Sequence, residues 1–229
     1  MKGIRGILFD KDGTLFDFQA TWGAWARGLI DELTEGDAAR AAALADAMAF
    51  DLQTARFRPD SVVIAGTGRE AAELLAPLLP GWEIEALEAC VADKAAHLAP
   101  VEAIPLAPLL DRLRAAGYRL GIATNDFEEV ARAHVGPLGD RFDFIAGFDS
   151  GHGGKPEPGM LLAFARAVGL APEAVLMVGD SRHDLIAGRA AGMATLAVLT
   201  GVATEAELAP FADAVRPDIG HLPALLGIV

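Results

Sequence analysis

Hydrophobic positions in the second half of the chain follow two alternating spacings, and each spacing predicts a different element. Short runs of consecutive apolar residues indicate strands that are buried on both faces. Between these runs, apolar residues recur at the spacing of amphipathic helices. We predict strands over residues 118–123, 142–146, 174–178, 194–199 and 213–216. The helices predicted beside them cover residues 106–116, 127–135, 158–168, 182–191 and 221–226.

The first part of the chain has a different pattern. A buried strand is predicted over residues 4–9, and the segment that follows is rich in Ala, Leu and Glu. This segment predicts helices over residues 21–33, 37–55, 69–79 and 84–98. Because alternating strands and helices form a parallel sheet covered on both faces, the first strand must join the later ones. We therefore predict an α/β fold, a doubly wound parallel sheet formed by residues 1–17 and 99–229, with an α-helical cap domain inserted over residues 18–98.

Two carboxylates stand directly after the first predicted strand. Asp10 and Asp12 are followed at once by Gly13 and Thr14. The end of a strand places these carboxylates at the carboxyl edge of the sheet, where doubly wound folds bind ligands. A turn with glycine exposes consecutive backbone N–H groups that suit an anion. Two carboxylates beside an anion site indicate that a cation joins them.

Further polar residues follow three other strands at the same predicted edge. Thr124 and Asn125 follow strand 118–123, and a hydroxyl near a helix N-terminus can donate to a phosphate oxygen. Lys155 is the cation of a loop rich in glycine and proline, where it can neutralise a phosphoryl group. Asp180 follows strand 174–178, and Asp184 lies one helical turn further on the same face.

These four stretches, in this order, resemble the four motifs of the haloacid dehalogenase superfamily. The first reads Asp-Lys-Asp-Gly-Thr-Leu, the second closes a strand with Thr, the third is Lys-Pro-Glu-Pro, and the fourth begins Gly-Asp and reaches Asp184. The resemblance covers the core and the inserted cap, and it is nearest to the subgroup of phosphatases similar to phosphoglycolate phosphatase. It implies a Rossmann-like core and a Mg²⁺-dependent phosphatase.

The resemblance also implies a role for each matching residue. Asp10 would be the nucleophile that forms an aspartyl-phosphate, and Asp12 the acid and base that serves the leaving group and then water. Asp10 and Asp180 would hold Mg²⁺ with their side chains and Asp12 with its backbone carbonyl, while Asp184 would act directly or through water. The substrate's phosphoryl group would be bound by Thr124, Asn125 and Lys155. Dehalogenases of this superfamily need no acid at the second position, so Asp12 favours phosphoryl chemistry.

Asp17 fits the same motif's continuation and is predicted to be a hinge or structural carboxylate. Trp22 and Trp25 share one face of helix 21–33 and are predicted to be packing residues. Arg56 or Arg58 would hold a carboxylate of the substrate if one is present, and the alternative is that both are solvated at a helix end.

Composition limits the partners of the chain. The sequence of 229 residues contains 19 Lys and Arg against 32 Asp and Glu, which gives a formal net charge of −13. This acidity argues against binding to nucleic acid or to anionic membranes. Cys90 is the only cysteine, and neither a signal peptide nor an apolar run of membrane-spanning length is visible. We expect a cytoplasmic monomer or homodimer whose partner is a small phosphorylated metabolite.

Two other functions stay open at this point. A phosphomutase similar to β-phosphoglucomutase would use the same motifs while protecting its phosphoenzyme from water. A catalytically idle core retained as a binding module is the second alternative, although Asp10, Asp12, Lys155 and Asp180 are all intact. The leading hypothesis is hydrolysis of a small phosphate monoester, such as phosphoglycolate, under a cap that limits access.

Overall fold

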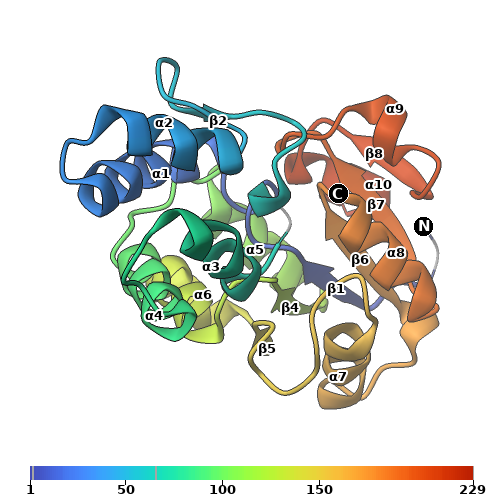
Figure 1. Ribbon diagram of the computed structural model, residues 1–229. Coiled ribbons are helices and arrows are strands. Elements are labelled where there is room, and N and C mark those ends of the chain that lie inside the picture. The colour runs from blue at the N-terminus through green and yellow to red at the C-terminus, as the bar shows by residue number, and fades with distance from the viewer. Residues whose placement is uncertain (2, 65, 229) are drawn as a thin grey trace.

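Six parallel strands form one sheet in the computed structural model, which describes residues 1, 3–64 and 66–228. Their order across the sheet is β5-β4-β1-β6-β7-β8, so the chain runs outward from β1 in both directions (Figure 1). This arrangement confirms the predicted doubly wound α/β class. The strands are β1 (Gly6–Phe9), β4 (Arg119–Ala123), β5 (Phe144–Ala146), β6 (Val175–Gly179), β7 (Ala194–Val198) and β8 (Ala214–Arg216).

The central strands are buried on both faces, as their continuous apolar sequences predict. Every residue of β1 and of β6 is buried. Because side chains of a strand alternate between faces, Ile7 and Phe9 belong to one hydrophobic cluster and Leu8 to another. The first cluster is covered by α5 (Leu106–Ala115), α6 (Glu128–Val135) and α10 (Leu222–Leu226). The second is covered by α7 (Gly159–Ala167) and α8 (Arg182–Ala190).

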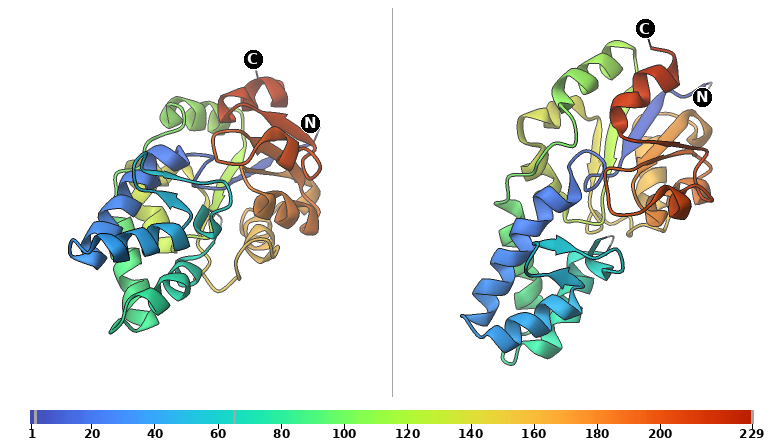
Figure 2. Two further views of the ribbon diagram at one scale, coloured as in Figure 1. Left: turned by 45° about the horizontal axis from the view of Figure 1, so that its top comes forward. Right: turned by 90° about the horizontal axis from the view of Figure 1, so that it is seen from above.

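Between β1 and α5 lies an inserted segment, residues 18–98, with a hydrophobic cluster of its own. Its helices are α1 (Phe18–Thr34), α2 (Ala38–Ala47), α3 (Gly68–Leu75) and α4 (Ile84–Ala96). The view from above places these helices at one end of the molecule, with both termini at the other (Figure 2). Asp17 accepts a hydrogen bond from the backbone N–H of Ala20 and is the N-cap of α1, a structural role that matches its prediction.

One predicted helix of the inserted segment is wrong. Helix 37–55 ends at Ala47 and is followed by an antiparallel hairpin of β2 (Phe50–Asp51) and β3 (Arg56–Phe57). The rings of Phe50 and Phe57 pack edge to face with their centroids 5.0 Å apart. The Ala-rich sequence is helical as far as Ala47, and burial of the aromatic pair stabilises the hairpin that follows it. The segment is therefore not wholly helical.

The other predicted elements are present with small shifts of their ends. A short helix, α9 (Glu205–Leu208), was not predicted, although Thr204 and Glu207 form a capping box at its start. Among the described residues, no helix combines the length and the apolar character needed to cross a membrane.

Candidate active site

Three carboxylates meet where β1 and β6 end side by side. The backbone N–H of Asp10 donates to the carbonyl of Val178 at 2.8 Å, which fixes the register of the two strands at this edge. Oxygen atoms of Asp10, Asp180 and Asp184 all lie within 4.8 Å of one another, and all three residues are buried. The strand order reverses at β1, so this is the position at which a doubly wound sheet is expected to bind ligands.

Lys155 reaches this cluster from the loop before α7. Its Nζ donates to Asp10 Oδ1 at 2.5 Å and to Asp184 Oδ1 at 2.6 Å. Asn125 holds the loop in place: its Nδ2 donates to the Lys155 carbonyl at 2.9 Å, and its Oδ1 accepts from the Lys155 backbone N–H at 2.8 Å. The glycine-rich loop thus brings its cation to the carboxylates, as the sequence suggested.

Burial dominates the electrostatics of the cluster. It raises the pKa of Asp10 to about 7, with Lys155 opposing the rise and the charge of Asp184 adding to it. The pKa of Asp180 is raised by burial and by the neighbouring charges of Asp10 and Asp184. Burial alone would lower the pKa of Lys155, but the charges of Asp10 and Asp184 raise it above its usual value. Three carboxylates and one ammonium leave two negative charges uncompensated when all are ionised.

This donor set fits a hard divalent cation. Carboxylate oxygens are the ligands such ions prefer, and the uncompensated charge equals that of the ion. Two glycines leave room around Asp180: a Cβ at Gly13 would lie 2.2 Å from Asp180 Oδ2, and one at Gly201 would lie 1.6 Å from the same atom. Both carboxylate oxygens of Asp184 accept hydrogen bonds. Oδ1 accepts from Lys155 Nζ, and Oδ2 accepts from Ser181 Oγ at 2.6 Å.

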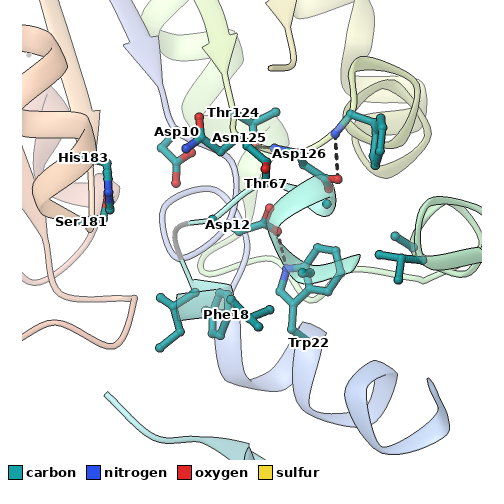
Figure 3. A pocket seen from close by; sticks show the side chains of 18 of the residues that line it. Asp10, Asp12, Phe18, Trp22, Thr67, Thr124, Asn125, Asp126, Ser181 and His183 are labelled. Carbon is teal, nitrogen blue, oxygen red and sulfur yellow. Dashed lines mark hydrogen bonds between the residues drawn. The ribbon is translucent and has the colours of Figure 1, made fainter. Parts of the chain in front are cut away.

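Asp12 turns its side chain away from this cluster. Its Oδ2 lies 2.6 Å from Lys11 Nζ, and its Oδ1 accepts from Trp22 Nε1 at 2.7 Å (Figure 3). Both oxygens are thus engaged outside the cluster of Asp10, Asp180 and Asp184. Among the atoms of Asp12, its backbone carbonyl is the one left for a cation at that cluster.

Lys11 belongs to a buried network that the sequence reasoning missed. Lys11 has no exposed surface, and its Nζ lies 3.1 Å from Asp126 Oδ2 and 3.0 Å from His134 Nδ1. An ammonium only donates, so His134 Nδ1 accepts and its Nε2–H donates to the carbonyl of Ala95 in α4 at 2.7 Å. Burial would lower the pKa of Lys11, but Asp12 and Asp126 raise it. The signal in the sequence was a lysine at the end of a strand predicted to be buried on both faces.

Thr124 lies at the end of β4, where it is buried and lines a pocket shared with Asp10 and Lys155. Its hydroxyl accepts from the backbone N–H of Asp126 at 3.1 Å and retains its own proton for another acceptor. The structure therefore brings together Asp10, Asn125, Lys155, Asp180 and Asp184 at one edge, with Thr124 beside them. Asp12 lines the same pocket, and its carboxylate contacts Lys11 and Trp22.

The pocket extends from the sheet edge into the inserted segment and contains about 780 Å³ of empty space, part of it open to solvent. Trp22 and Trp25 both line it, and both also pack in the hydrophobic cluster of the inserted segment, as predicted. Arg56 and Arg58 do not line it. Arg58 pairs with Asp46 and Asp60 on the surface, as the alternative of a solvated arginine predicted.

Comparison with known proteins identifies the class. The family model for haloacid dehalogenase-like hydrolases matches residues 4–192. The chain belongs to this family, which confirms the resemblance seen in its motifs.

Among its relatives is a protein named phosphoglycolate phosphatase from Xylella fastidiosa, 34% identical over 203 residues that cover 86% of this chain and 81% of the relative. A protein of the same name from Xanthomonas campestris is 31% identical over 203 residues. The aligned residues cover 88% of this chain and 86% of that relative. CbbY from Rhodobacter sphaeroides, solved in complex with phosphate, shares the fold: the TM-score is 0.70 with 24% identity, and 96% of each chain is covered.

Proposed function

We propose that this hydrolase is a Mg²⁺-dependent phosphatase that hydrolyses a small phosphate monoester through an aspartyl-phosphate on Asp10. The observation that carries the proposal is the buried contact of Asp10 with Lys155 beside Asp180 and Asp184. This contact supports a nucleophile (Asp10) next to a cation for the phosphoryl oxygens (Lys155). The neighbouring carboxylates would supply the oxygen ligands of a metal ion. The names of the relatives make phosphoglycolate the reference ester.

The first step transfers the phosphoryl group to the protein. An Asp10 carboxylate oxygen attacks phosphorus, the bond from phosphorus to the ester oxygen breaks, and Asp12 gives its proton to the departing alkoxide. Lys155 and the Thr124 hydroxyl donate to the phosphoryl oxygens. The residues that would hold Mg²⁺ are Asp10, Asp180 and Asp184, together with the backbone carbonyl of Asp12. The ion would supply positive charge that offsets the crowded carboxylates.

The second step returns the protein to its starting state. Asp12 takes a proton from a water molecule whose oxygen attacks phosphorus, and the bond between phosphorus and Asp10 breaks. Inorganic phosphate leaves, and Asp10 is again a carboxylate. We also propose that residues 18–98 act as a cap domain on a core of residues 1–17 and 99–229, because the pocket is shared between them.

The test measures phosphate released from a panel of small monoesters, phosphoglycolate included, with Mg²⁺ and with a chelator. Release should require Mg²⁺ and should fall by about a thousandfold or more in Asp10→Asn. Asp140→Asn, which changes an exposed carboxyl group, serves as the control. Release that persists in Asp10→Asn would contradict the proposed nucleophile.

The phosphomutase alternative has its own outcome in this assay. It predicts turnover of a hexose phosphate that is activated by a bisphosphate and releases little free phosphate. An idle module predicts no turnover of any ester.

A further inference from the structure

The wall that the inserted segment contributes to the pocket is apolar. It includes Phe18, Trp22, Trp25, Phe57, Ile64 and Val91. No described residue of segment 18–98 that lines the pocket carries a charge. Thr67 is a polar member of this wall, and its hydroxyl is committed to Glu70 in the capping box of α3. A charged group on the substrate would therefore find no side chain of opposite charge on this side.

The cations around the pocket are already paired. Lys155 lines it but contacts Asp10 and Asp184, and Lys11 is enclosed by Asp12 and Asp126. His183 lines the pocket from the exposed start of α8, on the core side and apart from Trp22 (Figure 3). A carboxylate such as that of glycolate would lose its hydration without gaining a cationic side chain of the inserted segment among the described residues.

Aromatic rings in this wall pack on one another. Trp22 and Trp25 pack edge to face with their centroids 5.0 Å apart, and Phe18 packs on Phe57 at 5.5 Å. Trp25 lines the pocket, and its buried Nε1–H has no hydrogen-bond partner among the described residues. An acceptor atom on a bound ligand would satisfy this donor.

We infer that the organic part of the substrate is an apolar, ring-bearing group with at most one hydrogen-bond acceptor, and that it lies against Trp22, Trp25 and Phe57. This inference rests on the proposed phosphatase function. The phosphoryl group is held at the sheet edge, so the alcohol portion of the ester must extend into the aromatic wall. The apolar wall distinguishes the substrate expected for this chain from phosphoglycolate, the ester in the names of its relatives.

The test compares kcat/KM for benzyl phosphate, ethyl phosphate and phosphoglycolate, three esters of primary alcohols. Burying a phenyl ring should favour benzyl phosphate over ethyl phosphate by roughly 10- to 100-fold, with phosphoglycolate lowest. A preference for phosphoglycolate over benzyl phosphate would overturn the inference while leaving the phosphatase intact. Absence of Mg²⁺-dependent release from every ester would instead defeat the proposed function itself.

Ala92 offers a matched pair of variants, because it lies on α4 and lines the pocket. Ala92→Arg places a cation in the apolar wall. It should raise the ratio of kcat/KM for phosphoglycolate to kcat/KM for benzyl phosphate by about tenfold or more. Ala92→Leu measures the effect of bulk alone and should not shift the ratio toward phosphoglycolate. An equal ratio in both variants would contradict the assignment of this wall to the organic group.

A second inference comes from the network around Lys11. Both oxygens of the Asp12 carboxylate are held, one by Lys11 Nζ at 2.6 Å and the other by Trp22 Nε1 at 2.7 Å. Lys11 is itself fixed by Asp126 and His134, and His134 bonds to the carbonyl of Ala95 in α4. The orientation of Asp12 is thus set by contacts from the core and from two helices of the inserted segment.

We propose that Lys11 is a positioning residue that orients Asp12 for proton transfer to the leaving group. The proposal rests on the role given to Asp12 above. Loss of Lys11 removes the contact at Oδ2, so Asp12 keeps only the hydrogen bond from Trp22 and loses its fixed direction. Proton donation matters for an alcohol that leaves poorly and much less for a phenol that leaves well.

Benzyl phosphate and p-nitrophenyl phosphate form a matched pair of similar shape for this test. In Lys11→Met, kcat/KM for benzyl phosphate should fall by about tenfold to a hundredfold while that for p-nitrophenyl phosphate changes little. Equal losses on both esters, or no loss on either, would overturn the proposal. Lys11→Gln removes the ion pair with Asp12 but retains a polar group in the buried site, so a loss confined to benzyl phosphate is expected there too, and this variant decides the question if Lys11→Met does not fold.

Discussion

The two sides of the pocket differ in almost every physical property. The sheet edge brings buried charges within hydrogen-bond distance: Asp10 to Lys155 at 2.5 Å and Lys155 to Asp184 at 2.6 Å. The inserted segment faces this edge with aromatic and aliphatic side chains such as Phe18 and Trp25. A buried charge network tolerates little change because each group balances another, whereas an apolar wall can change shape without leaving a charge unpaired. Under the proposed function, the sheet edge supplies the reacting groups and the inserted segment contacts the organic part of the substrate.

The largest effect that separates the two sides is expected from Lys155→Met. The variant removes the cation that contacts Asp10 and Asp184, so kcat should fall by about a hundredfold to a thousandfold. Steady-state kinetics on the best ester measures this loss. Lys94→Met is the matched control, since Lys94 pairs with Glu32 on the surface of the inserted segment and should keep its activity. If Lys155→Met and the wild type have the same kcat, Lys155 does not act in the proposed mechanism.

Phe57→Ala should disturb the inserted segment and spare the chemistry. Phe57 is buried and packs on Phe18 and Phe50, so its truncation should cost about 3 to 5 kcal/mol of unfolding free energy. Denaturant unfolding measures this cost, with Phe57→Leu as a milder control. At a temperature where the variant is folded, the preference for benzyl over ethyl phosphate should shrink while the dependence on Mg²⁺ persists. Unchanged ester preference would contradict the division of roles.

The carboxylate cluster should also make stability depend on pH and on metal. Burial raises the folded-state pKa of Asp10 from 3.8 to about 7, so folding favours the protonated form. The stability contribution of that proton is present below about pH 4 and is lost as pH rises toward 7. With a chelator present, the melting temperature should therefore fall over this range, and Asp10→Asn should reduce the fall. Added Mg²⁺ should raise the melting temperature near pH 7 more than near pH 5.

The smallest effect is expected at the junction of the two regions. Asp17 caps α1 through the N–H of Ala20, and Asp17→Ala should lower the unfolding free energy by about 1 kcal/mol. Thermal unfolding measures the loss, and Asp17→Asn should retain most of the cap. A large fall in kcat without loss of stability would show that Asp17 does more than begin the helix.

Much of the sheet edge could be predicted because each residue follows a strand. Asp10 and Asp180 are local signals because each stands where an apolar run stops. Lys155 is marked by its place between glycines and prolines in the loop after β5. Parallel strands then bring such positions together without further information. The fold class followed from the same alternation of strands and helices.

Other features depend on contacts between distant positions, which no local pattern records. Lys11 and His134 lie 123 residues apart in the sequence, and their hydrogen bond forms only where the fold brings α6 to the turn after β1. A hairpin stands where the end of a helix was predicted, because the rings of Phe50 and Phe57 pack on one another across its two strands. Trp22 was predicted to pack inside the helical segment, yet its indole also donates to Asp12 in the core.

The central claim is that Asp10 carries the phosphoryl group between the two steps. Asp12→Asn removes the base of the second step, so reaction with p-nitrophenyl phosphate, followed by acid quench and peptic digestion, should trap the intermediate. Mass spectrometry should then find one phosphoryl group on the peptide that contains Asp10, and none after the added substitution Asp10→Asn. A burst of nitrophenol with the phosphoryl group on another residue, or with no phosphorylated peptide, would contradict the account.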